Sequence, residues 1–292
     1  MSQSVLQVRD LTVSYPCDKG GKVSVLKGVS FALKPGETVA LVGRSGCGKS
    51  TLSKALLRLI ESDGGSICLD GRDVTHAMGA ERRAVYRTIQ MVFQNPVGSF
   101  DPRRTLGDGI GESLRNAGVG ADECRRRVAV LLERCGLPAN FALRYPSQVS
   151  GGQCQRAAIA RALSVEPRVL VCDEATSSLD VTVQKRILDL IGALGKEMGL
   201  AVLLITHDLA LASSRCDRML VMDEGRIVEE GSPQEVIGHP RSAAARRRGG
   251  SLRPPRPRSE GALSLLVASR VVMGRDRGRQ GVCPQVQRSS RW

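Results

Sequence analysis

The residues with the clearest chemical meaning are glycines, a lysine and a serine that follow a short apolar run. Gly43, Gly48, Lys49 and Ser50 fit the phosphate-loop pattern G-x-x-x-x-G-K-[ST]. The flanking residues predict a strand before this loop and a helix after it. Glycines are needed because the backbone must curl around phosphate oxygens. We therefore predict a nucleoside triphosphate site formed by Gly43, Arg44, Ser45, Gly46, Cys47, Gly48, Lys49, Ser50 and Thr51.

Lys49 and Ser50 are the two side chains of this loop expected to meet phosphate and metal directly. In this pattern the lysine reaches the β- and γ-phosphates, and the hydroxyl ligates Mg²⁺. The positive end of the following helix favours the same anion. The alternative is a glycine-rich turn without a ligand, but such a turn has no use for lysine and serine at this register.

Two acids end an apolar run at residues 168–174, which predicts a buried strand. At the carboxyl end of a core strand, Asp173 can hold Mg²⁺ through water, and Glu174 can accept a proton from an attacking water. The alternative is a surface acidic pair. Four consecutive apolar residues before the pair instead favour a position at the mouth of the sheet.

Weaker signals lie elsewhere along the chain. Gln94 and His207 each follow a predicted strand, a usual place for ligand-facing side chains in an open α/β sheet. Taken alone, a single glutamine is weak support for function, and a structural histidine is the commoner alternative. Tyr15 ends the first strand of a predicted antiparallel sheet over residues 5–33 and could stack on a base, although local sequence favours ordinary edge packing.

A second glycine pair precedes a predicted helix. Ser150, Gly151, Gly152 and Gln153 would form another anion site at a helix N-terminus. A simple serine cap followed by flexible glycines is an equally good interpretation of this spacing.

Charge and cysteine content narrow the function classes. The net charge of +14 arises mostly from residues 241–292, which hold 13 arginines, no lysine and two acids. The rest of the chain is nearly neutral, so we expect no nucleic-acid partner. Nine cysteines without metal-ligand spacing are expected to be reduced thiols. No uncharged apolar run approaches the roughly 20 residues of a membrane span, and the N-terminus does not have the pattern of a signal peptide.

In this order, the motifs resemble the nucleotide-binding subunit of ATP-binding-cassette (ABC) transporters over residues 5–240. The family's signature sequence corresponds to residues 149–153, its D-loop to Ser178, Leu179 and Asp180, and its switch histidine to His207. The resemblance implies an α/β fold: a P-loop NTPase core of the RecA type with a mostly parallel sheet, an N-terminal antiparallel β subdomain and an inserted helical subdomain. We expect the ATPase domain at residues 4–240, its helical subdomain at about 96–165, and a basic, disordered tail at 241–292.

The resemblance also implies roles for individual residues, with ATP and Mg²⁺ as cofactors. The expected catalytic residues are Lys49, Gln94, Glu174 (general base) and His207 (γ-phosphate), and the expected metal ligands are Ser50, Gln94 and Asp173. Tyr15 is expected to stack on adenine. Ser150, Gly151, Gly152, Gln153 and Asp180 are expected to contact nucleotide, the signature residues doing so across a head-to-tail dimer.

The implied partners are two membrane-spanning permease subunits, a second ATPase chain of the same or a related kind and, indirectly, a substrate-binding protein. The protein would lie on the cytoplasmic face of the cell membrane. The amino-acid sequence at residues 93–103 and 178–184 resembles that of the ATPases of dipeptide, oligopeptide and nickel importers. A soluble ABC ATPase of DNA repair or translation is the alternative, and it is disfavoured by the short distance from Gly43 to Ser150 and by the single cassette. Residues 241–292 depart from this subgroup, which suggests a frameshifted C-terminus or a genuine basic tail.

Overall fold

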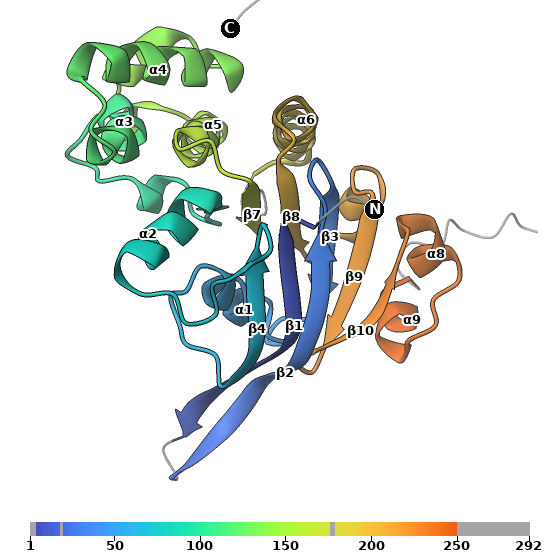
Figure 1. The fold of residues 1–292 in the computed structure, drawn as a ribbon. Coiled ribbons are helices and arrows are strands. Elements are labelled where there is room, and N and C mark those ends of the chain that lie inside the picture. Colours follow the sequence, from blue (N-terminus) through green and yellow to red (C-terminus); the bar gives the residue numbers. More distant parts are fainter. Residues whose placement is uncertain (1–3, 18–19, 176–178, 250–292) are drawn as a thin grey trace, which may run out of the picture. The chain divides into compact units, whose positions relative to one another are not determined.

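The computed structural model describes residues 4–17, 20–175 and 179–249. Two sheets organise these residues (Figure 1). The first is antiparallel, with strand order β2-β1-β4-β5. Its strands are β1 (Leu6–Cys17), β2 (Gly21–Leu33), β4 (Gly64–Leu69) and β5 (Arg72–Asp73). The antiparallel subdomain predicted from residues 5–33 is therefore confirmed and is completed by β4 and β5.

The second sheet has the order β10-β9-β3-β8-β7-β6 and is parallel except for β10 at its edge. Its strands are β3 (Thr38–Gly43), β6 (Ile89–Val92), β7 (Val169–Asp173), β8 (Ala201–Thr206), β9 (Arg218–Asp223) and β10 (Arg226–Gly231). Parallel strands end at the same edge of a sheet, so the residues after β3, β6, β7 and β8 meet there.

Helices follow most of these strands. They are α1 (Lys49–Leu56), α2 (Gly79–Thr88), α3 (Leu106–Asn116), α4 (Ala121–Arg134), α5 (Gly151–Leu163), α6 (Val181–Met198), α7 (Leu209–Ser213), α8 (Pro233–Gly238) and α9 (Ala243–Gly249). Three short 3-10 helices are η1 (Val97–Ser99), η2 (Ala139–Leu143) and η3 (Pro146–Gln148). The helical insertion between β6 and β7 contains α3, α4 and α5, which pack on one another (Figure 1). Among the described residues, no helix has the length and apolar character needed to cross a membrane.

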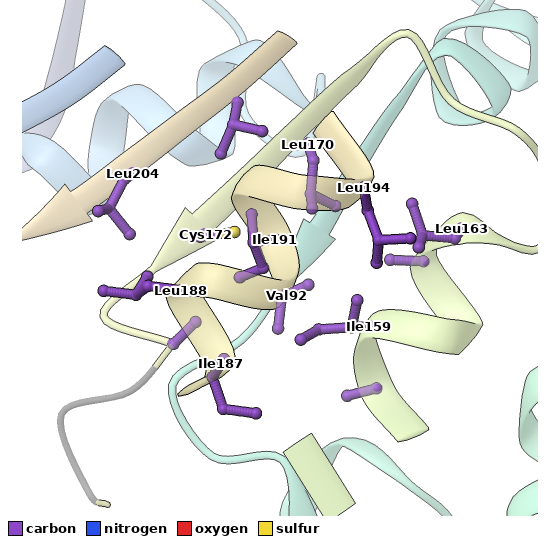
Figure 2. Close-up of a cluster of buried hydrophobic side chains, with 14 of the residues drawn as sticks. Val92, Ile159, Leu163, Leu170, Cys172, Ile187, Leu188, Ile191, Leu194 and Leu204 are labelled. Atoms are coloured by element: carbon purple, nitrogen blue, oxygen red, sulfur yellow. The ribbon is translucent and has the colours of Figure 1, made fainter. Parts of the chain in front are cut away.

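Strand alternation divides the core between the two faces of the parallel sheet. Ala40 and Val42 of β3 belong to the cluster shared with α3–α6, whereas Val39 and Leu41 belong to the cluster shared with α1 and the antiparallel sheet. Figure 2 shows the first cluster, in which apolar side chains of α6 and α5 cover β6, β7 and β8. The sheet is buried on both faces, as expected for parallel strands.

The beginning of the basic segment differs from its predicted disorder. Ser242 precedes α9, and its backbone N–H and hydroxyl donate to Glu229 of β10 at 2.8 and 2.6 Å. Ala244 and Ala245 are buried, and Arg247 pairs with Asp223 at 3.1 Å. Residues 241–249 therefore pack on the end of the sheet, because short alanine side chains let the helix approach closely. Residues 250–292 lie outside the described residues.

The eight cysteines among the described residues are free thiols. Burial raises the pKa of Cys135, Cys172 and Cys216 to about 12 and that of Cys154 to about 11. Such thiols stay protonated and unreactive near neutral pH.

Candidate nucleotide site

The phosphate loop connects the buried strand β3 to α1, as the sequence pattern requires. Gly46 and Gly48 have φ angles of 78° and 110°, which side-chain-bearing residues rarely adopt. At Gly43 a Cβ would lie 2.5 Å from the Cys47 sulfur and 2.6 Å from the Met222 carbonyl oxygen. The loop is thus curled tightly, and its glycines are required for the path that the backbone follows.

Lys49 is a buried cation of this loop. Its side chain is buried, and Nζ donates to the carbonyl oxygens of Gly43 and Arg44 at 2.9 Å each. No carboxylate of the described residues lies within salt-bridge distance of it. A buried ammonium at the positive end of α1 makes this location favourable for an anion.

Asp173, at the end of β7, faces the start of α1. It lines the same pocket as Ser50, and Ser53 Oγ donates to its Oδ2 at 3.5 Å. Burial, followed by the nearby charge of Glu174, raises the pKa of Asp173 above its usual value. A divalent cation would relieve both effects, so the Ser50 hydroxyl and the Asp173 carboxylate fit Mg²⁺, which takes few protein ligands and completes its shell with phosphate and water.

Glu174 is held between two side chains from neighbouring strands. Gln94 Nε2, after β6, donates to its Oε2 at 3.2 Å, and His207 Nδ1, after β8, lies 3.3 Å from its Oε1. The backbone of Glu174 has a φ of 46°, the left-handed region that is uncommon for residues other than glycine. Such strain is concentrated at functional sites, where the surrounding structure imposes it. Gln94, Glu174 and His207, which are far apart in the sequence, thus come together.

A pocket of about 320 Å³ connects the phosphate loop with Gln94, Asp173 and Glu174, and His207 does not line it. It is lined by Val25, Ser45, Gly46, Gly48, Lys49, Ser50, Thr51, Gln94, Asp173 and Glu174. Nine of these ten residues were predicted from sequence. Val25 of β2 was missed, because an apolar residue in a strand carries no chemical signal.

The signature residues do not line this pocket. Ser150 caps α5 and accepts a hydrogen bond from the Gln153 backbone at 3.3 Å, while the Gln153 side chain accepts one from the Ser150 backbone at 2.9 Å. A Cβ at Gly152 would lie 2.7 Å from Val183 in the first turn of α6. Asp180 caps α6 by accepting from the Val183 backbone at 2.9 Å. The signature therefore lies beside the start of α6, which Asp180 caps, and none of these residues lines the pocket of the phosphate loop. Ser178 falls outside the described residues.

Tyr15 also lies outside the pocket. It is 36% exposed on β1 and pairs with Val23 of β2, two residues before the pocket residue Val25. Its predicted stacking on a base stays a prediction.

The chain is similar to a known protein family and to several known proteins. The ABC transporter family matches residues 26–177. Glutathione import ATP-binding protein GsiA of Salmonella paratyphi A is 44% identical over 252 residues, covering 84% of this chain and 40% of the relative. The protein of the same name from Pectobacterium atrosepticum is 44% identical over 253 residues, with coverage of 84% and 41%. The chain spans about 40% of the length of these curated relatives.

Solved structures are similar as well. CbiO1 from Clostridium perfringens, part of the ABC transporter complex cbiONQ, superposes with a TM-score of 0.73 at 30% identity, covering 87% of this chain and 96% of that one. The ATP-binding cassette MJ0796, in a dimeric post-hydrolysis state with ADP and Pi, has a TM-score of 0.71 at 29% identity, with coverage of 78% and 98%. With the family match extending over more than half of the sequence and the fold shared with solved cassettes, this chain belongs to the ABC transporter family.

Proposed function

We propose that the chain is the ATP-hydrolysing motor subunit of an ABC importer. The observation that carries the proposal is the position of Glu174, which contacts Gln94 and His207 and lines one pocket together with Lys49 and Ser50. An anion-binding loop and a positioned carboxylate are two of the parts that ATP hydrolysis uses. The similarity to proteins named as import ATP-binding proteins supports transport rather than DNA repair or translation.

Binding is assigned to the loop and the start of α1. Lys49 would exchange its two carbonyl partners for β- and γ-phosphate oxygens, and the backbone N–H groups of residues 45–51 would surround the remaining charge. Ser50 and Asp173, with Gln94, would hold Mg²⁺, which neutralises phosphate charge when bound.

Chemistry is assigned to the strand ends. Glu174 accepts the proton of the attacking water, while Gln94 and His207 keep its carboxylate oriented. His207, whose side chain is 61% exposed, can turn to the γ-phosphate once nucleotide is present. The protein's task in phosphoryl transfer is mostly positioning and charge stabilisation, and these groups would supply this chain's share of it.

The proposal of a partner ATPase chain starts from the signature residues and Asp180, which do not line the pocket. The signature residues and Asp180 would act on nucleotide held by a second ATPase chain, the same or related. A neighbouring groove of about 510 Å³ shares Ser50, Gln94 and Asp173 with the site and includes the exposed side chains of Leu59 and Phe93. We assign it to one of two permease subunits, which would place the protein at the cytoplasmic face of the membrane, with a substrate-binding protein as an indirect partner. The named relatives favour a peptide-like substrate, and nickel is the second candidate.

The test compares two glutamates of similar backbone conformation. Glu174 and Glu166 have φ angles of 46° and 52°, but only Glu174 lies in the pocket. Glu174→Gln is expected to lower steady-state ATP turnover by roughly 10²–10⁴-fold with little change in ATP affinity. Glu166→Gln is expected to leave both quantities unchanged. Near-normal turnover in Glu174→Gln would remove Glu174 from the mechanism.

A further inference from the structure

The end of β9 and the turn between β9 and β10 contact the phosphate loop. This contact involves residues 222–225, which do not line the nucleotide pocket. Two of them, Met222 and Gly225, meet the loop at its first glycine, at Cys47 and at its last glycine.

Met222 contacts both ends of the loop. Its partner across the parallel ladder is Gly43, and its carbonyl oxygen would lie 2.6 Å from a Cβ at that position. Its side-chain methyl carbon would lie 3.0 Å from a Cβ at Gly48, and the side chain is 1% exposed. The two outer glycines of the loop are therefore packed against one buried residue.

Gly225 holds the middle of the loop. Its N–H donates to the Cys47 carbonyl at 3.1 Å, and its own carbonyl accepts from the Lys27 backbone at 2.9 Å. Glu224 and Gly225 have φ angles of 43° and 82°, the pattern of a type I′ hairpin turn. A Cβ at Gly225 would lie 2.2 Å from the Val25 carbonyl oxygen, so only glycine allows this approach.

We propose that Met222 and Gly225 are positioning residues that hold the phosphate loop in its nucleotide-accepting curvature before nucleotide binds. A loop ordered in advance loses less conformational entropy on binding, and this raises affinity. The inference rests on the proposed nucleotide binding, but the curvature of the empty loop can be measured without nucleotide. Cys47 reports it, because its sulfur packs against Gly43 and the residue is buried.

The first test compares two methionines of β9. Met222 pairs with Gly43 at the end of β3. Met219 pairs with Ala40, which is also in β3, three residues before Gly43. Both are buried, so Met222→Ala and Met219→Ala should lower the melting temperature by similar amounts. Only Met222→Ala should weaken ATP affinity, by about 10-fold. Only this variant should also speed the alkylation of Cys47 in the nucleotide-free protein, as measured by peptide mass spectrometry.

The second test compares two glycines with matching backbones. Gly225 and Gly118 have φ angles of 82° and 83°, but a Cβ at Gly118 meets nothing within 4 Å. Both alanine variants carry the same left-handed strain. Only Gly225→Ala should weaken ATP affinity and expose Cys47. If Gly225→Ala does not fold, the methionine pair still decides the question.

The outcomes separate the two proposals. Equal Cys47 alkylation rates and equal ATP affinities in Met222→Ala and Met219→Ala, measured well below their melting temperatures, would overturn the positioning role. Wild-type protein that fails to bind ATP would overturn the proposed function. In that case faster Cys47 alkylation in Met222→Ala would still support the contact between the turn and the loop.

Discussion

The N-termini of α1 and α5 both carry glycine motifs, but only that of α5 is capped by side chains. α1 begins at Lys49 after Gly48, and no side chain caps it. α5 begins at Gly151, and Ser150 and Gln153 cap it reciprocally. The first helix end therefore keeps backbone donors for a ligand, whereas the second satisfies its own donors.

Their surroundings differ in the same direction. At α1, Lys49, Ser50 and Asp173 lie together beside the pocket. At α5, Ser150 and Gly151 are exposed, and the neighbouring side chains are Leu179 and Val183. The α1 end is therefore surrounded by charged and polar groups of its own chain, whereas the α5 end is already capped and leaves Ser150 and Gly151 exposed at the surface.

Among the substitutions that test this difference, removal of the Lys49 ammonium group should have the largest effect on ATP affinity. Lys49→Ala deletes a buried donor at the loop, and charge-assisted hydrogen bonds contribute about 1.5–3 kcal/mol each. ATP affinity should fall by about 100-fold or more, as measured by titration calorimetry. Lys54→Ala, an exposed lysine of the same helix, is the control and should retain affinity within about twofold. Equal losses in the two variants would show that only the general charge of α1 matters.

Neutralising Asp173 should lower activity but raise stability. Because burial raises its pKa above that of the unfolded chain, the charged form costs stability at pH 7, and this cost disappears as pH falls through the shifted pKa. Asp173→Asn should therefore melt at a higher temperature at pH 7, with the gain vanishing in acid. Hydrolysis should fall by about 10–100-fold and need more Mg²⁺. A lower melting temperature at pH 7 in magnesium-free buffer would contradict this account of the site.

The N-terminus of α5 can be tested by comparing two serine caps that make the same hydrogen bonds. Ser150 caps α5 and Ser232 caps α8, each in a reciprocal box with the residue three positions later. Replacing either with Ala should cost about 1 kcal/mol of stability. Only Ser150→Ala should also lower the turnover of the assembled ATPase, by about 10-fold, without changing ATP affinity of the isolated chain. Identical turnover in both variants would leave Ser150 with a capping role alone.

The smallest effect is expected from the C-terminal segment. Truncation after Pro240 removes α9, including buried Ala244 and Ala245, and leaves Glu229 without the donors of Ser242. The melting temperature should fall by about 2–6 °C, with ATP affinity unchanged. Truncation after Gly249 is the control and should keep the full-length value. Resequencing the gene separately checks the frameshift hypothesis for residues 241–292.

Most of the site was predictable from sequence because its chemistry resides in unusual combinations of residues. Glycines followed by Lys49 and Ser50 have few other uses, and Asp173 and Glu174 follow a run too apolar for a surface strand. The boundaries of α3 also depend on local residues, since Thr105 and Asp108 form a capping box at the start of Leu106–Asn116. These features depend on neighbours in the chain, so local sequence determines them.

Only the tertiary structure decided which strands that are distant in the sequence lie side by side. The contacts of Glu174 with Gln94 and His207 depend on the order β8-β7-β6, which no local pattern reports. The support of the phosphate loop by Met222 depends on β9 lying beside β3, and an apolar residue in a strand gives no sign of it. The packing of α9 was missed because alanine and arginine suggest little core, yet Glu229 offers hydrogen-bond acceptors there. Residue type thus determined which groups could do chemistry, and strand order determined which of them meet.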